Sequence, residues 1–221
     1  MLTSLVGSEM CIRDRSGSPF KGRLDVLPSG RNLYSNDPSS IPSKAAYEQG
    51  SKLASEFLKR HLQDKGDHAR TLLIDLWGSA TMRTAGEEFS MALCLMGVSP
   101  TWVDGSDKVS GIEVITIPEL NRPRVDVTLR VSGLFRDIFP SLTQLYDQVT
   151  NVLSKRYEYP EDNPFVNNTD IARIYGPKSG NYGLRMSSNI KEYTKDNREN
   201  YGEDWIESSA CLLYTSPSPR D

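Results

Sequence analysis

The stretch Arg122-Pro-Arg-Val-Asp-Val-Thr-Leu-Arg-Val-Ser-Gly-Leu-Phe-Arg-Asp-Ile-Phe-Pro140 decides which fold this sequence predicts. Four apolar residues at alternate positions predict one face of a buried β-strand: Val125, Val127, Leu129 and Val131. The Ser132-Gly133 break then lets the chain turn, so that Arg136 and Asp137 open a helix over about 136–156. Open α/β sheets bind ligands where such a strand ends and its loop begins. We therefore expect a site at the carboxyl end of this strand.

The pattern on either side predicts a Rossmann-like layered α/β fold with a mainly parallel sheet and irregular N- and C-terminal segments. The expected elements are a helix from its cap Ser43 to Gly66, strands over 72–77, 100–103 and 109–117, and a helix over 86–96. The apolar run 72–77 is typical of a strand covered on both faces. A polar loop at 79–84 and the helix after it should lead to a strand that pairs with 72–77 in parallel. The predicted α/β core spans about 70–156.

The two ends of the chain do not share this periodicity. Residues 1–15 and 211–221 look like translated sequencing-adapter sequence of the kind found in metagenomic assemblies, so we interpret both as artefactual extensions that do not pack on the fold. Residues 16–210 are then an internal fragment of a larger protein.

Composition excludes several classes of partner and site. A formal net charge of −3 gives no support to nucleic-acid binding, and no apolar run is long enough to span a membrane. Outside the suspect ends Cys94 is the single cysteine, which favours a reducing cytoplasm over a disulfide framework or a thiolate metal site. The glycine-rich segment 176–183 lacks the Gly-Lys-Ser/Thr of a phosphate loop, so we expect no ATP site in this chain.

Five ordered blocks resemble the CobN/magnesium chelatase family, and in particular the large tetrapyrrole-binding subunit of cobaltochelatase. The blocks are Gly22–Tyr34 (GRLDVLPSGRNLY), Leu76–Glu88 (LWGSATMRTAGEE), Met96–Trp102 (MGVSPTW), the stretch Arg122–Pro140, and Arg173–Gly183 (RIYGPKSGNYG). The magnesium chelatase H subunit is a more distant match, because its version of Thr128–Gly133 is closer to Val-Val-Asn-Cys-Ser-Gly.

The resemblance implies insertion of Co²⁺ into hydrogenobyrinic acid a,c-diamide during aerobic cobalamin biosynthesis. It also implies AAA+ ATPase and adaptor subunits as partners, which use ATP and Mg²⁺ to drive the reaction. Two alternatives stay open. One is the magnesium chelatase H subunit, which acts on protoporphyrin IX, and the other is a noncatalytic tetrapyrrole-binding or assembly module.

Metal insertion requires surface for the macrocycle, cations for its carboxylates, and a base for the two pyrrole protons. The substrate-binding candidates are Tyr34, Trp77 and Tyr182 for the ring, Arg31, Arg83 and Arg136 for its carboxylates, and Ser132 in the loop. Glu87, Glu88 and Asp137 are the candidate catalytic carboxylates. Purely structural roles compete with these, because Arg136 can pair with Asp137 and acids in a first helical turn are common. The sequence assigns no residues to the metal.

We predict that deleting residues 1–15 and 211–221 leaves the fold intact, because neither end continues the apolar pattern of the core. Thermal unfolding of the shortened chain, beside the full chain and each single deletion, measures this. A midpoint lower by several degrees contradicts the prediction.

Overall fold

A computed structural model describes residues 38–166, 171–177, 202–203, 205–206 and 211–212. In chain order its elements are the 3₁₀ turn η3 (Pro38–Ser40), α2 (Lys44–Lys65), β1 (Thr71–Leu76), α3 (Gly78–Thr84), α4 (Glu87–Met96), β2 (Val98–Trp102), β3 (Val109–Val114), α5 (Ile117–Leu120), β4 (Asp126–Val131), α6 (Gly133–Ile138), α7 (Pro140–Ser154), β5 (Ile174–Gly176) and β6 (Cys211–Leu212). The predicted α/β class is confirmed.

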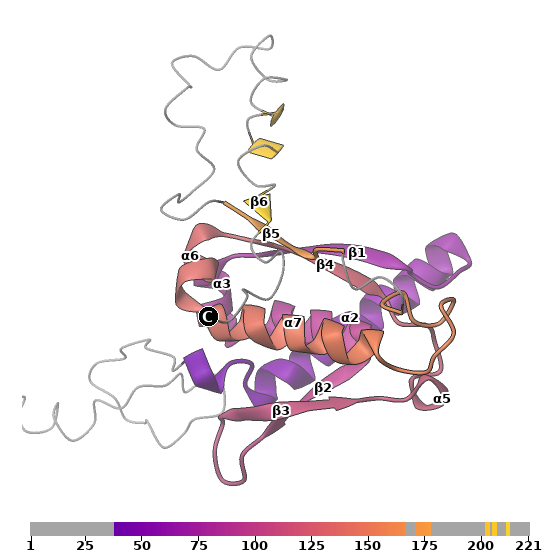
Figure 1. The fold of residues 1–221 in the computed structure, drawn as a ribbon, viewed down its shortest axis with the longest axis horizontal. Helices are drawn as coiled ribbons and strands as arrows, with labels where there is room; N and C mark the ends of the chain where they lie inside the picture. The colour runs from indigo at the N-terminus through magenta and orange to yellow at the C-terminus, as the bar shows by residue number, and fades with distance from the viewer. Residues whose placement is uncertain (1–37, 167–170, 178–201, 204, 207–210, 213–221) are drawn as a thin grey trace, which may run out of the picture.

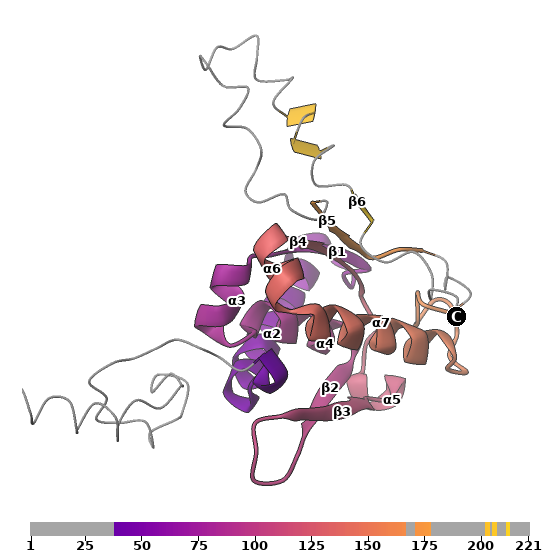
Figure 2. The same cartoon turned by 60° about the vertical axis from the view of Figure 1, so that its left-hand side comes forward.

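The described elements form three layers (Figure 1). One layer is a four-stranded sheet with the order β1-β4-β5-β6, called sheet A below. Helices α2, α4 and α7 form the middle layer, and the hairpin of β2 and β3 lies on their far side (Figure 2). None of the described helices combines the length and apolarity that crossing a bilayer requires.

Sheet A is parallel between β1, β4 and β5, with Leu72 opposite Val127 and Leu129 opposite Ile174. The predicted parallel pairing of the strand after α4 with β1 is wrong, because β2 pairs antiparallel with β3 instead. A short turn explains this: the Val103 N–H donates to the Lys108 carbonyl oxygen at 2.9 Å, and Gly105 takes φ 72°. A connection this short closes a local hairpin before a crossover can form.

The apolar run in β1 is not covered on both faces. Leu76 is buried, but Leu73 is 61% exposed and Asp75 also faces solvent. Successive side chains of a strand point to opposite faces, so a strand with one wet face can still carry leucines on both. The prediction of a doubly covered strand is therefore wrong.

Two local predictions around the sheet are also corrected. Residues 79–84 belong to α3, a seven-residue helix too short to show apolar periodicity. The helix predicted over 136–156 is two helices, because Phe139 leaves helical geometry (φ −118°, ψ 49°) and Pro140 starts α7 without an N–H to donate. Arg136 and Asp137 consequently lie in the last turn of α6 and do not open a helix.

The predicted ends of α2 and α4 are confirmed. The Ser43 hydroxyl oxygen accepts from the Ala46 N–H at 3.2 Å, and Gly66 ends α2 in the left-handed conformation with φ 74°. The two helices pack closely, because a Cβ on Gly50 would lie only 2.6 Å from the Cβ of Ser90. Gly97 ends α4 at φ 76°, and a Cβ there would collide with the Arg124 guanidinium.

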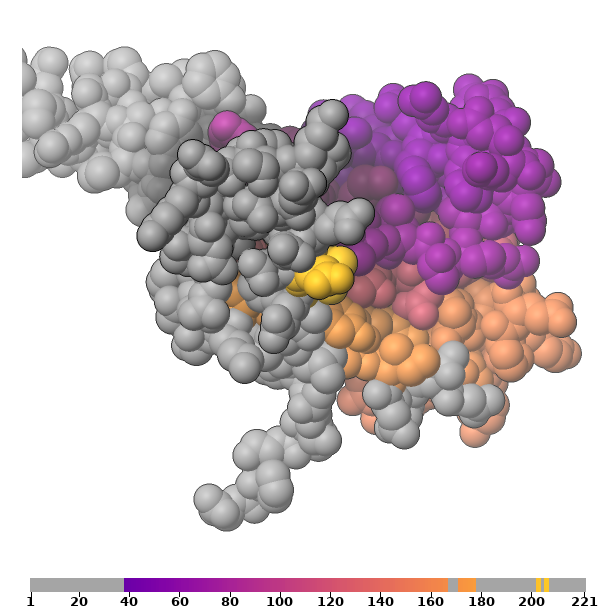
Figure 3. Space-filling view, turned by 90° about the horizontal axis from the view of Figure 1, so that it is seen from above, coloured from indigo at the N-terminus to yellow at the C-terminus, as the bar shows by residue number. Residues whose placement is uncertain are grey.

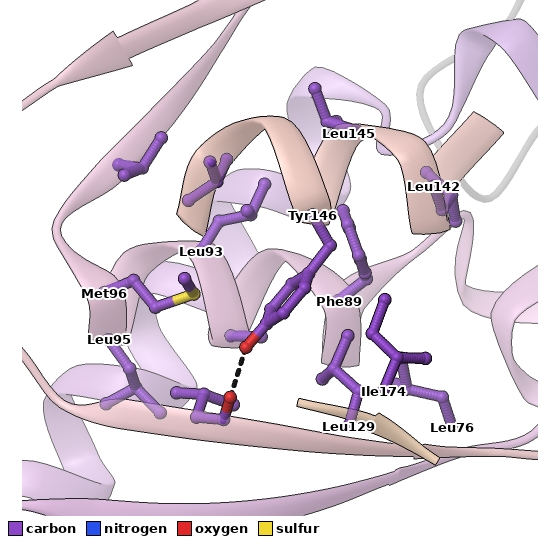
Figure 4. Packing of buried hydrophobic residues seen from close by; sticks show 14 of the residues in the cluster. Leu76, Phe89, Leu93, Leu95, Met96, Leu129, Leu142, Leu145, Tyr146 and Ile174 are labelled. Atoms are coloured by element: carbon purple, nitrogen blue, oxygen red, sulfur yellow. Dashed lines mark hydrogen bonds between the residues drawn. The ribbon is translucent and has the colours of Figure 1, made fainter. Parts of the chain in front are cut away.

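The core lies between sheet A and the helix layer (Figure 4). Among its fully buried members are Phe89, Leu93 and Met96 of α4, Val127 and Leu129 of β4, and Leu142, Tyr146 and Val149 of α7. The Tyr146 hydroxyl donates to the Val127 carbonyl oxygen, and burial raises the pKa of this phenol above its usual range. The hydrogen bond lets a polar tip enter an apolar core without an unsatisfied donor.

A buried ion pair joins three segments of the chain that are far apart in sequence. The Arg124 side chain is 0% exposed, and it donates to both carboxylate oxygens of Glu158 at 2.8 Å. It also donates to the carbonyl oxygens of Met96 (2.9 Å), Gly97 (3.1 Å) and Ile115 (2.7 Å). One guanidinium thus holds together the end of α4, the residue that follows β3, and the loop after α7.

The structure describes two residues of the C-terminal extension, Cys211 and Leu212. Cys211 and Leu212 form β6 and pair antiparallel with Gly176 and Tyr175. The expectation that residues 211–221 make no packing contact is wrong for these two. Residues 1–15 lie outside the described residues, and the dispensability of both ends stays a prediction.

We predict that Arg124→Met lowers the free energy of unfolding by about 3 to 5 kcal/mol, since it leaves the Glu158 carboxylate buried without its main partner. Urea unfolding measures the loss. Arg60→Met is the matched control, because the Arg60–Asp64 pair is 86% and 63% exposed and contributes about 1 kcal/mol or less.

The Arg124–Glu158 pair also makes the free energy of unfolding depend on pH. Burial by itself raises the Glu158 pKa, but hydrogen bonds from Arg124 and Arg156 outweigh it and hold the pKa below its usual range. The stabilisation is therefore complete above about pH 4.5 and is lost as the pH falls through the lowered pKa. Equal acid sensitivity of wild type and Arg124→Met would contradict this assignment.

Candidate functional site

The carboxyl ends of β1 and β4 are joined through one hydroxyl group. The Ser132 N–H donates to the Leu76 carbonyl oxygen at 2.9 Å and continues the parallel ladder. The Ser132 hydroxyl oxygen then accepts from the N–H of Gly78 at 3.1 Å and from that of Phe135 at 3.2 Å. One side chain therefore anchors the starts of both α3 and α6 at this end of the sheet.

Gly78 allows these two helix starts to approach. A Cβ at Gly78 would lie 2.8 Å from the backbone nitrogen of Phe135 and 2.9 Å from the carbonyl carbon of Leu134. Backbone atoms cannot move aside as the tip of a side chain can. The close contact between the starts of α3 and α6 thus depends on a residue without a side chain.

Arg136 and Asp137 lie at the same end of the sheet, on α6. The guanidinium donates to both carboxylate oxygens of Asp137, at 2.7 and 2.9 Å, and a further N–H donates to the Pro177 carbonyl oxygen. The Arg136 side chain is 11% exposed and the Asp137 side chain 35%. The pair thus ties α6 to the residue after β5, while the carboxylate remains open to solvent.

Trp77 stands where β1 ends and α3 begins. It is 41% exposed, and its indole N–H donates to Asp75 Oδ2 at 3.1 Å. The structure therefore gathers four of the predicted residues, Trp77, Ser132, Arg136 and Asp137, at the carboxyl ends of neighbouring strands. Asp75 was missed by the sequence reasoning, although its place two residues before Trp77 on a strand puts both side chains on one face.

The acids Glu87 and Glu88 lie at the far end of α3. This helix has seven residues, which span about 10 Å at 1.5 Å per residue. The Thr84 hydroxyl donates to Glu88 Oε2 at 3.0 Å and accepts from the Glu87 N–H at 3.3 Å, an arrangement that stabilises the start of α4. Arg83 is exposed in the last turn of α3. The catalytic or binding roles of these three residues stay predictions.

Three other predicted residues, Arg31, Tyr34 and Tyr182, lie outside the described residues. Within the described part of the chain, no group of three or more His, Cys, Asp or Glu side chains is placed to hold a metal ion. What the described residues offer together is an exposed indole, a fixed guanidinium and an accessible carboxylate. Such groups can hold a flat conjugated ligand and accept a proton from it.

Comparison with known proteins gives the family. The family model described as CobN/Magnesium Chelatase matches residues 11–218. The chain belongs to the CobN/magnesium chelatase family. It is 39% identical over 211 residues to the aerobic cobaltochelatase subunit CobN of Pseudomonas aeruginosa, covering 86% of this chain and 17% of that relative. The magnesium-chelatase H subunit of Chlorobaculum parvum is 34% identical, over 72% of this chain and 13% of that protein.

A solved structure supports the same family at the level of the fold. The catalytic subunit of cobaltochelatase from Mycobacterium tuberculosis matches with a TM-score of 0.73 and 34% identity, over 88% of this chain and 18% of that one. The mixed α/β fold is therefore that of a CobN/magnesium chelatase family protein. The chain spans less than a fifth of the length of each of these relatives.

We predict that Ser132→Ala lowers the free energy of unfolding by about 1 to 2 kcal/mol, because two backbone N–H groups lose their acceptor. Urea unfolding measures the change. Ser79→Ala, at an exposed position of α3, is the matched control and should cost about 0.5 kcal/mol or less. Equal stability of the two variants would show that the Ser132 hydroxyl does not hold the site together.

Proposed function

We propose that this chain is part of the tetrapyrrole-binding subunit of an ATP-dependent cobaltochelatase. The reaction would insert Co²⁺, as a substrate, into hydrogenobyrinic acid a,c-diamide in aerobic cobalamin biosynthesis. The main support is the 39% identity with a CobN subunit over 86% of the chain. Trp77, Arg136 and Asp137 all lie at the carboxyl-end side of sheet A, and an indole, a guanidinium and a carboxylate are groups that such a substrate would require.

In this proposal, Arg136 pairs with a peripheral carboxylate of the macrocycle. Its guanidinium already holds Asp137 in two hydrogen bonds, so a substrate carboxylate would join or replace that partner. Asp137 is the more exposed member of the pair, with 35% of its side chain open to solvent against 11% for Arg136. It would accept a pyrrole proton as the metal enters the ring. Glu87 and Glu88 remain second candidates for this role.

The energy for metal insertion would come from ATP hydrolysis by separate subunits. The glycine-rich segment 176–183 has no complete phosphate-binding motif, so we assign ATP and Mg²⁺ to AAA+ motor and adaptor subunits. Net charge gives no reason to expect nucleic acid, and we infer a cytoplasmic location from Cys94 being the single cysteine outside the two ends of the chain. These partners and this location belong to the proposal.

Two alternatives have specific support. Similarity to a magnesium-chelatase H subunit over 72% of the chain keeps Mg²⁺ insertion into protoporphyrin IX as a rival. The small share of each relative that the chain covers favours a noncatalytic tetrapyrrole-binding module as the role of this segment by itself. Parallel titrations with hydrogenobyrinic acid a,c-diamide and protoporphyrin IX separate the first rival from the cobalt assignment.

We predict that Arg136→Ala weakens binding of hydrogenobyrinic acid a,c-diamide by about 1.5 to 3 kcal/mol, the range for a hydrogen bond to a charged group. Fluorescence quenching titrations measure affinity, and urea unfolding of the same samples measures stability. Arg60→Ala, an exposed arginine on α2, is the control.

The two roles of Arg136 give opposite results. If its only role is to join Asp137 and Pro177, the substitution lowers stability and leaves the affinity of the folded protein unchanged. That outcome would remove Arg136 from the site. Loss of affinity in Arg136→Ala with a partial return in Arg136→Lys would support the proposed ion pair.

A further inference from the structure

The outer face of sheet A carries a continuous set of four contacting side chains: Trp77, Asp75, Arg130 and Trp205. The Trp77 N–H donates to Asp75 Oδ2 at 3.1 Å, and an Arg130 N–H donates to the same oxygen at 2.7 Å. The Arg130 guanidinium carbon lies 4.2 Å from the centre of the Trp205 ring. We call these residues the Trp77 cluster.

The strand register brings the cluster together. Asp75 of β1 lies directly opposite Arg130 of β4, and both side chains are on the face of sheet A that points away from the helix layer. Trp77 follows two residues after Asp75 and so emerges on the same side. Trp205 comes from residues 205–206 near the C-terminus, which are yellow in Figure 3, and reaches the cluster through Arg130.

The Trp77 indole is exposed to solvent, yet its orientation is restrained by a hydrogen bond. Trp77 is 41% exposed, whereas the Arg130 side chain beneath the network is only 13% exposed. An exposed indole normally rotates, and binding a ligand then costs the entropy of stopping it. Here the Asp75 carboxylate accepts the indole N–H, and Arg130 donates to the same carboxylate oxygen and holds it in place. The ring is therefore already oriented before a ligand arrives.

We propose that Trp77 is a stacking surface for the conjugated ring of the tetrapyrrole, and that Asp75 and Arg130 are positioning residues that hold its indole. The inference rests on the proposed function, because a conjugated macrocycle is the ligand class that an oriented, half-exposed indole suits best. Trp77 contacts the macrocycle directly, whereas Asp75 and Arg130 act only by holding Trp77 in position. Trp205 anchors Arg130 from the other side by a cation–π contact.

The test is a double-mutant cycle on the 221-residue chain, with hydrogenobyrinic acid a,c-diamide as the probe and its absorption spectrum as the readout. Trp77→Phe and Asp75→Ala should each weaken binding about fivefold or more. In the Trp77→Phe background, Asp75→Ala should add about twofold or less, because the indole N–H it serves is gone. Asp75→Asn should keep most of the affinity, since its amide oxygen still accepts that N–H.

Two matched controls lie away from the cluster. Trp102→Phe removes an indole whose N–H donates to the Pro42 carbonyl oxygen at 2.9 Å, and Glu113→Ala removes an exposed acid on β3. Both should bind the probe within about twofold of wild type. Thermal unfolding of every variant separates lost folding from lost binding.

Each result has a distinct meaning. Unchanged affinity in Trp77→Phe, or an equal effect of Asp75→Ala in both backgrounds, overturns the inference while the proposed function stands. Absence of binding by the wild-type chain to both hydrogenobyrinic acid a,c-diamide and protoporphyrin IX contradicts the proposed function, and the inference fails with it. Binding that depends on Trp77 and on Asp75 only when Trp77 is present supports the inference.

Discussion

Parallel pairing of β1 with β4 is the constraint on which the site depends. The register that places Leu76 opposite Val131 also places Asp75 opposite Arg130 and brings Ser132 to the start of α3. A slip of one residue would turn the buried Val127 and Leu129 to solvent, so burial of that face specifies the register. The core and the candidate site are consequently selected by the same hydrogen-bond ladder.

A second constraint comes from the buried charge of Arg124. Removing a guanidinium from water is costly, and here five acceptor atoms on Glu158, Met96, Gly97 and Ile115 compensate for it. Those acceptors come from distant parts of the chain. The network therefore favours one arrangement of α4, the hairpin and the loop after α7.

Within the site, structural and functional roles are divided among neighbouring residues. Ser132 and Gly78 bring two helix starts together through backbone contacts, and Arg136 joins α6 to Pro177. Trp77 and Asp137 keep exposed surface that these contacts do not use. An uneven exposure of this kind lets a rigid frame present a few accessible groups, which is what a preorganised binding site requires.

The sequence by itself determined the α/β class, the alternating buried face of β4, and the helix ends at Ser43, Gly66 and Gly97, because each follows from local spacing or from the backbone preference of one residue. It also located the end of β4 at Ser132, although the chain there enters α6 directly. Tertiary structure alone decided that β1 pairs with β4, that one face of β1 stays wet, and that Asp75 meets Arg130. Strand partners and ion pairs between distant segments depend on which surfaces the whole chain can bury together. The spacing of residues within one segment does not determine them.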